Sequence, residues 1–290
     1  MLHEYKLLIS YEEIEEIIEK LLLVDISNTY YEEPIEVKKT DNGYGYSIGG
    51  KKDVELYIYG DPEEVPNLPQ LYFDKIEKSL QLPRSAISYR LIDEQWNMTF
   101  EDVSINEEWV IQYQGSTQSY DDKKVLLFDP QGAFGTGLHA TTQDCVRMIV
   151  DEDFSNFSVL DLGTGSGILS IAASIRGAKS VCAIDIQPVT REIIHNCQLN
   201  DINNVTVVEA DLFADYSINE SYDWIFINIG AEETVLLCQQ HQLMSKGDAF
   251  IVSGIVDWNE QKVVSYFIQN GYTIKKRAQQ EEWVTLMFLK

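Results

Sequence analysis

Apolar positions in the first 95 residues recur with two different periods and predict alternating strands and helices. Residues 5–9 form a short run that is typical of a strand. In residues 11–23 the apolar positions recur three and four apart, which predicts an amphipathic helix. Ser10 stands where an N-cap is expected and Glu13 follows three residues later, so the pattern predicts a capping box at the start of this helix.

The remainder of the first 95 residues predicts a second group of strands and a helix, similar in size to the first group. Residues 30–37 resemble a strand, and residues 42–50 read as a glycine-rich turn or loop. Alternating apolar and polar residues at 54–59 indicate a strand. We expect a helix at residues 69–80 and a last strand at residues 87–92. The resulting order, β-α-β-β-α-β, is typical of a ferredoxin-like α+β domain, which we expect to fill the first 95 residues.

The stretch between residues 93 and 124 is polar and acidic. It predicts an interdomain linker with one or two short elements, which we place at residues 96–125. A linker there would let the domains on either side fold alone.

From about residue 126 onward, apolar runs alternate with helical stretches, which is the signature of a doubly wound parallel sheet. The last two runs are joined without room for a helix, so they predict a closing antiparallel hairpin. The expected fold of residues 126–290 is therefore a seven-stranded, Rossmann-like α/β domain. The predicted strands are residues 158–162, 180–184, 205–208, 224–228, 249–253, 272–277 and 283–289.

The length of 290 residues suits two domains, and a hydrophobic share of 44% is enough for each to bury a core. The chain is strongly acidic, with 47 Asp and Glu against 22 Lys and Arg and a formal net charge of -25. Such a field repels phosphate backbones and anionic membranes, so we expect neither direct nucleic-acid binding nor membrane binding. A basic protein partner would complement this charge.

The four cysteines share no C-x-x-C spacing and have no cluster of histidines nearby, so the sequence predicts no metal site and no disulfide framework. No apolar run reaches 18 residues and the N-terminal segment is acidic, which argues against a signal peptide and a membrane span. We therefore expect a cytoplasmic protein.

A glycine-rich loop follows the predicted strand at residues 158–162 and precedes a helical stretch. Gly163, Gly165 and Gly167 let a ligand approach the backbone, and the start of the helix offers unpaired N–H groups. The spacing is G-x-G-x-G rather than the G-x-G-x-x-G of dinucleotide sites, and Asp161 stands two residues ahead. A carboxylate there suits the cationic sulfonium and amino groups of S-adenosylmethionine, so we expect this cofactor.

Asp185 ends the next predicted strand, 22 residues after Gly163. An acidic residue in this place can accept hydrogen bonds from ribose hydroxyls in NAD enzymes and in methyltransferases. It therefore does not distinguish the two classes. The predicted closing hairpin does, since S-adenosylmethionine-dependent methyltransferases typically end in one.

A longer signature lies at residues 133–142, Ala-Phe-Gly-Thr-Gly-Leu-His-Ala-Thr-Thr. With it the chain resembles the PrmA family of class I S-adenosylmethionine-dependent methyltransferases, which methylate ribosomal protein eleven of the large subunit. The resemblance covers residues 126–290. Its further elements are Gly163 to Leu169, Asp185, Asn228-Ile229, Ser253-Gly254-Ile255 and Glu281-Glu282-Trp283.

The resemblance implies a set of cofactor contacts. In the family these come from the second Thr of the loop signature, the first Gly of the glycine loop, the acid of strand two and the Asn of strand four. Phe134 and Thr136 would belong to the loop that closes over the cofactor, and Asp161 and Gly165 complete the expected site. By position the four family contacts are Thr142, Gly163, Asp185 and Asn228.

Methyl transfer from a sulfonium needs a deprotonated nucleophile held about 3 to 3.5 Å from the methyl carbon, so positioning dominates. We assign Asn228 the catalytic role of holding the target amine; the alternative is a plain strand-end turn residue. His139 would either accept a proton from the amine or only hydrogen-bond the backbone. Trp283 is either core packing, which we favour, or a substrate contact.

The chain departs from the family pattern at three places near the site. Ala140 stands where the family usually has Pro, Gly230 replaces Leu, and Gln187 replaces a frequent Asp. None of these removes a proposed cofactor contact. The predicted linker also lacks the Lys-Pro and Pro-x-Trp elements of the family. Because the family's N-terminal domain grips the ribosomal substrate, departures in that part of the chain concern the substrate rather than the chemistry.

The resemblance implies a protein methyltransferase that modifies lysine side-chain or N-terminal amines of a basic, large-subunit ribosomal protein, and we expect a monomer. An enzyme of the same type with another protein substrate is one alternative. A non-catalytic cofactor-binding module is a second, and an NAD oxidoreductase is the weakest because of the glycine spacing.

Overall fold

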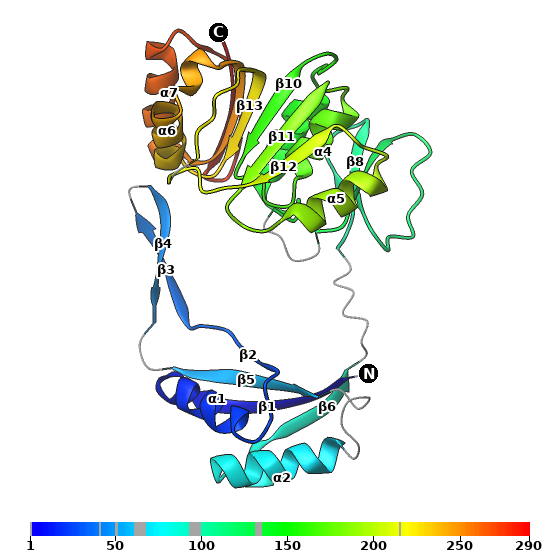
Figure 1. Ribbon diagram of the computed structural model, residues 1–290, viewed down its shortest axis with the longest axis vertical. Helices are drawn as coiled ribbons and strands as arrows, with labels where there is room; N and C mark the ends of the chain where they lie inside the picture. The colour runs from blue at the N-terminus through cyan, green and yellow to red at the C-terminus, as the bar shows by residue number, and fades with distance from the viewer. Residues whose placement is uncertain are drawn as a thin grey trace. The chain divides into compact units, whose positions relative to one another are not determined.

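The computed structural model describes residues 2–40, 42–49, 52–60, 68–92, 100–130, 135–214 and 216–290. Contacts within the chain divide it into two compact units (Figure 1). Unit 1 comprises Met1–Thr40 and Tyr44–Met98, and unit 2 comprises Asp41–Gly43 and Thr99–Lys290. Each unit has hydrophobic core clusters of its own.

Unit 1 is built on a four-stranded sheet in the order β2-β5-β1-β6, in which all neighbouring strands are antiparallel. Apart from an additional hairpin between β2 and β5, the chain order is strand, helix, strand, strand, helix, strand. The elements are β1 (Leu2–Ser10), α1 (Ile14–Leu22), β2 (Thr29–Tyr31), β5 (Asp53–Gly60), α2 (Leu68–Leu80) and β6 (Ser88–Ile92).

Alternation along the two central strands gives this sheet one apolar face. Tyr5, Leu7 and Ile9 of β1 are buried, and Leu7 lies opposite Leu56 of β5. These side chains form one core cluster with buried residues of α1 and α2. Both helices therefore cover the same face of the sheet, as the period-2 pattern of the strands requires.

The helix predicted at residues 11–23 is present, but its predicted capping box is wrong. Tyr11–Glu13 form a 3-10 turn before α1, and the Ser10 side chain makes no capping hydrogen bond. The amide of Tyr11 is instead satisfied by the carbonyl of Lys52, at 3.1 Å. A long-range backbone contact thus replaces the local cap that the sequence pattern predicts.

The prediction of a loop at residues 42–50 is also wrong in part. β3 (Ile35–Thr40) and β4 (Gly43–Ile48) form a separate two-stranded sheet. The reason is visible in β4, where Tyr44, Tyr46 and Ile48 occupy every second position. Aromatic and β-branched residues at this period favour a strand even when glycines stand between them.

Unit 2 contains the predicted α/β sheet of seven strands, in the order β12-β11-β10-β13-β14-β16-β15. The strands from β12 to β14 are parallel, and β16 pairs antiparallel with both β14 and β15. The predicted parallel sheet and its closing hairpin are both confirmed. The strands are β10 (Ser158–Leu162), β11 (Ser180–Asp185), β12 (Val205–Glu209), β13 (Tyr222–Asn228), β14 (Gly247–Val256), β15 (Thr273–Gln280) and β16 (Trp283–Leu289).

Helices cover both faces of this sheet, and Figure 1 shows α6 and α7 on one side and α4 and α5 on the other. Two core clusters correspond to the two faces. Ile225, Phe226 and Ile227 of β13 are all 0% exposed, as expected for a strand that is buried on both faces. The helices are α3 (Ala140–Val150), α4 (Ile168–Ile175), α5 (Thr190–Leu199), α6 (Ala231–Gln240) and α7 (Glu260–Gln269).

The predicted linker at residues 96–125 is wrong for its described part, residues 100–125. This part belongs to unit 2, where β7 (Val103–Ser104), β8 (Trp109–Tyr113) and β9 (Lys124–Phe128) form a three-stranded sheet. Trp109 and Ile111, with exposures of 5% and 0%, join the core cluster that also contains residues of α3 and α4. Polar turns on either side of β8 give the segment its linker-like composition, but the strand itself is apolar.

A fragment of residues 99–290 is expected to unfold cooperatively, whereas a fragment of residues 126–290 is not. The shorter fragment lacks β7 and β8, and with them the buried side chains of Trp109, Ile111 and Tyr113. Losing these three side chains removes about 5 to 9 kcal/mol of burial free energy. That is comparable to the whole stability of a typical domain, about 5 to 15 kcal/mol. Urea unfolding followed by circular dichroism checks this, and equal midpoints for the two fragments would contradict it.

Candidate functional site

The strand order of unit 2 reverses at β10, because β11 and β12 lie on one side of it and β13 and β14 on the other. In open α/β sheets, ligands bind in the crevice that such a reversal leaves at the carboxyl ends of the strands. Asp185 and Asn228 end β11 and β13, and Gly163 directly follows β10. The fold therefore brings these three predicted site residues to the same crevice.

The loop after β10 requires glycine at two positions. Gly163 has a φ of 67° and Gly167 a φ of 79°, both in the left-handed region. A Cβ on Gly163 would lie 2.8 Å from Cγ2 of Ile229, and one on Gly167 would lie 2.8 Å from Cγ1 of Ile193. Glycine at these two positions therefore lets the loop backbone pack directly against Ile229 and Ile193.

Asp161 lies on the buried side of this loop and is 1% exposed. Its Oδ2 accepts hydrogen bonds from Oγ1 of Thr164 at 2.7 Å and from Oγ of Ser170 at 2.6 Å. Burial raises the pKa of this carboxyl group. The geometry thus differs from the expected direct contact with a cofactor, since Asp161 ties the glycine loop to the first turn of α4.

The Asp185 carboxylate fastens the glycine loop to the end of β11. Its Oδ2 accepts a hydrogen bond from the amide of Gly165 at 2.8 Å, and its Oδ1 accepts one from the amide of Gln187 at 2.9 Å. A carboxylate has about four lone-pair sites, so acceptor capacity remains for the hydroxyls of a ribose. The same side chain can therefore shape the loop and bind a ligand.

Asn228 ends β13 on the other side of the reversal. It is partly exposed, and its side chain makes no hydrogen bond to another residue in the described part of the chain. The next residue, Ile229, packs against Gly254, where a Cβ would lie 2.9 Å from the carbonyl carbon of Ile229. The strand end is thereby held in place while the Asn228 amide stays available to a ligand.

The loop signature lies beside the glycine loop. Ser166 is 0% exposed, and its hydroxyl donates to the carbonyl of Gly135 at 2.7 Å. Thr136 is partly exposed, and its carbonyl accepts a hydrogen bond from the hydroxyl of Tyr113 at 2.7 Å. Phe134 lies outside the described residues, so its role in closing over the cofactor stays a prediction.

His139 caps helix α3. Its Nδ1 accepts a hydrogen bond from the amide of Thr141 at 3.4 Å and lies 2.8 Å from the Thr141 hydroxyl. The contact between the His139 side chain and the Thr141 amide favours the backbone role over the base role. The ring also meets Trp283 edge to face at a centroid distance of 4.9 Å, which is a packing contact. Thr142, a predicted cofactor contact, is 4% exposed in the first turn of the same helix.

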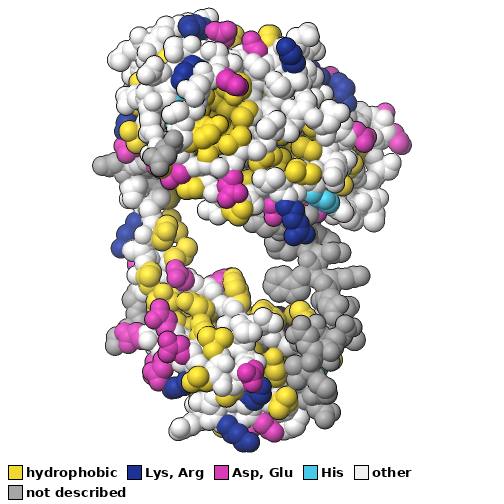
Figure 2. Space-filling view, viewed as in Figure 1, with side chains coloured by type: hydrophobic (Ala, Val, Ile, Leu, Met, Phe, Trp, Pro, Cys, Tyr) yellow, Lys and Arg dark blue, Asp and Glu magenta, His cyan; other side chains and the backbone are white. Residues whose placement is uncertain are grey.

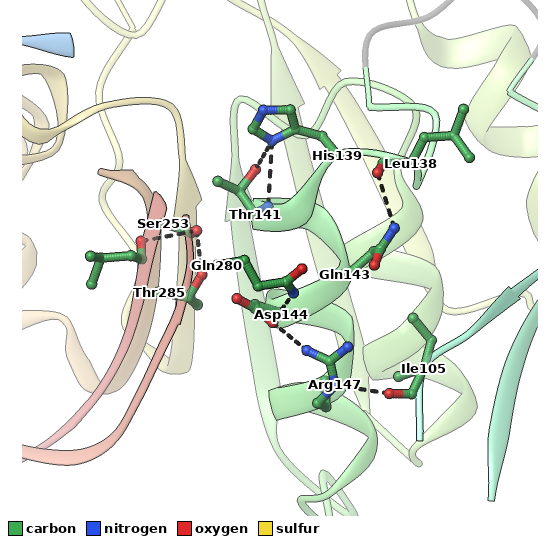
Figure 3. A network of polar contacts seen from close by, with 11 residues as sticks. Ile105, Leu138, His139, Thr141, Gln143, Asp144, Arg147, Ser253, Gln280 and Thr285 are labelled. Carbon is green, nitrogen blue, oxygen red and sulfur yellow. Dashed lines mark hydrogen bonds and ion pairs between the residues drawn. The ribbon is translucent and has the colours of Figure 1, made fainter. Parts of the chain in front are cut away.

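A polar network fixes α3 against two other elements of unit 2 (Figure 3). Asp144 is 2% exposed, accepts a hydrogen bond from Nε2 of Gln280 at 2.6 Å, and forms an ion pair with Arg147. The Nε of Arg147 in turn donates to the carbonyl of Ile105 at 2.8 Å. The helix that carries His139 and Thr142 is therefore tied both to β15 and to the segment between β7 and β8.

Sequence reasoning missed Tyr113, Ser166 and Asn196 as parts of this site. Asn196 is 0% exposed, and its amide binds both backbone groups of Asp129, at 2.7 and 2.8 Å, just before the signature loop. Its spacing to Asn200, four residues on, was a usable signal, because two amides on one helix face can reach a common backbone. Tyr113 carries no local signal of this kind.

The described residues contain no group of three or more His, Cys, Asp or Glu side chains that could hold a metal ion. All four cysteines, Cys145, Cys182, Cys197 and Cys238, are free. Within the described ranges, no helix is both long enough and apolar enough to cross a bilayer.

Comparison with known proteins points to one family. The family model described as ribosomal protein L11 methyltransferase (PrmA) matches residues 12–290. The ribosomal protein L11 methyltransferase of Bacillus subtilis (strain 168) is 30% identical over 302 residues, which cover 97% of this chain and 97% of that protein. The protein of the same name from Lactobacillus gasseri is 33% identical over 254 residues, covering 82% of this chain and 80% of that protein. The solved structure of ribosomal protein L11 methylase from Lactobacillus delbrueckii subsp. bulgaricus has a TM-score of 0.57 at 28% identity, covering 66% of this chain and 99% of that one.

His139→Ala is expected to lower the free energy of unfolding of unit 2 by about 1 kcal/mol, the usual cost of a lost N-cap. His139→Asn restores an acceptor at the helix start and should recover most of that loss. Both variants lose the contact with Trp283, so the difference between them isolates the cap. Urea unfolding measures it, and equal stabilities of the two variants would argue against the capping role.

Proposed function

The chain belongs to the PrmA family of ribosomal protein L11 methyltransferases, and we propose that it transfers methyl groups from S-adenosylmethionine to ribosomal protein L11. The acceptors in this proposal are lysine side-chain or N-terminal amines. One observation carries it: the glycine loop, Asp185 and Asn228 meet at the point where the strand order of unit 2 reverses.

The residues at the crevice fit S-adenosylmethionine as cofactor. The bound cofactor supplies an electrophilic methyl group on a sulfonium. Gly163 and Gly165 leave the backbone open to it, and the remaining lone pairs of Asp185 accept hydrogen bonds from its ribose. Thr136 of the signature loop and Thr142 of α3 complete the proposed binding site. Asp161 supports the glycine loop through its buried hydrogen bonds to Thr164 and Ser170.

We assign Asn228 to the target amine. Its partly exposed side chain makes no internal hydrogen bond within the described ranges, which supports this role. The amide oxygen can accept an N–H of the neutral amine and so orient the nitrogen lone pair. In-line displacement at a sulfonium needs little beyond such positioning, so no further acid or base is assigned.

We also propose that unit 1 is a ferredoxin-like domain that binds the protein substrate. The chain order of its elements and the antiparallel sheet order β2-β5-β1-β6 support this assignment.

Figure 2 shows hydrophobic side chains next to Asp and Glu side chains on the surface of unit 1. A surface of this kind suits a basic protein. The exposed large hydrophobic side chains of unit 1 include Leu8, Tyr30, Val37, Tyr46 and Ile48.

The proposal is tested by incubating the full-length protein with labelled S-adenosylmethionine and ribosomes that lack methylation of protein L11. Label in L11 is the expected result, with an Asn228→Ala variant as the negative control. Label in another protein and none in L11 would move the substrate to that protein. Binding of the cofactor with no label in any protein would contradict an enzymatic role.

Asp185→Ala is expected to weaken binding of S-adenosylhomocysteine by about 1 to 3 kcal/mol, because a charged hydrogen-bond acceptor is lost. Titration calorimetry measures the affinity, and NAD should not bind to either protein. Asp248→Ala is a suitable control, because it removes one exposed carboxylate near the amino end of β14, away from the crevice. Unchanged affinity in Asp185→Ala would show that the ribose lies elsewhere.

A further inference from the structure

The hydroxyl of Tyr113 donates a hydrogen bond to the carbonyl of Thr136 at 2.7 Å, across 23 residues of sequence. Thr136 belongs to the signature loop for which we propose a cofactor contact. Tyr113 lies in β8, outside every motif of the sequence. Tyr113, which belongs to no sequence motif, therefore holds the backbone of Thr136, for which a cofactor contact is proposed.

Tyr113 is itself firmly placed. It is 2% exposed, and its ring packs against Phe100 at a centroid distance of 5.0 Å and against Phe128 at 6.2 Å. Its backbone pairs with Phe128 of β9. Burial raises the pKa of the phenol to about 12, so the hydroxyl stays protonated at neutral pH and acts as a donor.

Asp102 fixes the strand end that carries Tyr113. Its Oδ1 accepts a hydrogen bond from the amide of Tyr113 at 2.9 Å. Its Oδ2 accepts from the hydroxyls of Ser116 at 2.6 Å and Tyr120 at 2.9 Å. One carboxylate thus joins the end of β8 to the turn that follows it, so the support of the signature loop cannot move freely.

The next glycine of the loop shows how closely Tyr113 approaches. Gly137 has a φ of 86°. A Cβ on Gly137 would lie 2.8 Å from the Tyr113 hydroxyl oxygen and 3.2 Å from Cδ1 of Ile168. Tyr113 therefore occupies the space that a side chain would need, and it constrains the loop by contact as well as by its hydrogen bond.

We infer that Tyr113 is a positioning residue for cofactor binding, whose hydroxyl holds the Thr136 carbonyl and keeps residues 135–139 of the signature loop in one conformation. The inference rests on the proposed function, because it takes S-adenosylmethionine as the ligand of this loop. A loop that is already ordered loses less conformational entropy when a ligand binds. Tyr113 therefore acts on the affinity for the cofactor and not on the affinity for the protein substrate.

Tyr113→Phe tests this inference, because it removes the hydroxyl and keeps the ring. In the full-length protein without ligand, hydrogen exchange of the amides in residues 135–139 should become about five- to tenfold faster, as expected for loss of one hydrogen bond. The affinity for S-adenosylhomocysteine, measured by calorimetry, should fall by about the same factor. The KM for S-adenosylmethionine should rise, while kcat and the KM for the protein substrate stay within about twofold.

Tyr272→Phe is the matched control. Tyr272 is 1% exposed, and its hydroxyl donates to the backbone carbonyls of Gly247 at 2.5 Å and Met244 at 3.1 Å. These carbonyls lie at the amino end of β14, whereas the crevice lies at the carboxyl ends of the strands. This variant should lose a similar amount of stability in urea, with no change in loop exchange or in affinity for S-adenosylhomocysteine.

Two outcomes would overturn the inference. Unchanged exchange of residues 135–139 in Tyr113→Phe would show that the hydroxyl does not hold the loop. An equal loss of S-adenosylhomocysteine affinity in both variants would reduce Tyr113 to a general structural residue. If the wild-type protein binds no S-adenosylhomocysteine, the proposed function fails instead, and loop exchange still decides whether Tyr113 holds Thr136.

Discussion

Ile229 is held between two glycines, and this contact sets the geometry of the crevice. A Cβ at Gly163 would lie 2.8 Å from the Ile229 side chain, and one at Gly254 would lie between 2.9 and 3.1 Å from Ile229 backbone atoms. Both glycines also have a positive φ. A side chain at either position would push the end of β13 away from its neighbours and move Asn228 with it. A site that acts by positioning its ligands therefore requires the ends of β10, β13 and β14 to approach each other closely.

The loops above this crevice depend on parts of unit 2 that lie outside the motifs. Asn200 binds both backbone groups of Leu127, at 2.9 and 2.7 Å, in the same way as Asn196 binds Asp129. The two amides, one in α5 and one on the residue that directly follows it, thereby hold β9 and the residue after β9. Tyr113 supports the signature loop from the neighbouring strand, so the three-stranded sheet β7-β8-β9 belongs to the site and does not act as a spacer.

The α/β sheet and the glycine loop could be predicted because their signals are local: short apolar runs, glycines at every second position and an acid at a strand end. Features that tertiary contacts determine could not be predicted from the sequence. Ser10 has a capping sequence, but the Tyr11 amide finds the distant carbonyl of Lys52. Asp161 has the position of a ligand contact, but the fold buries it under the loop. The hydrogen bond of Tyr113 follows from the packing of β8, which the polar composition around that strand conceals.

The negative net charge of the chain favours the protonated form of the target amine, whereas the proposed reaction needs its neutral form. A charge of -25 favours encounter with a basic protein, but it also favours the protonated form of a lysine, whose ordinary pKa is about 10.4. The amine has to lose that proton before its lone pair can attack a methyl group. A carboxylate at the end of β13 would stabilise the ammonium and raise its pKa further. In the role proposed for it, the amide of Asn228 would accept a hydrogen bond from the amine without adding a charge, and so would not stabilise the protonated form as a carboxylate would.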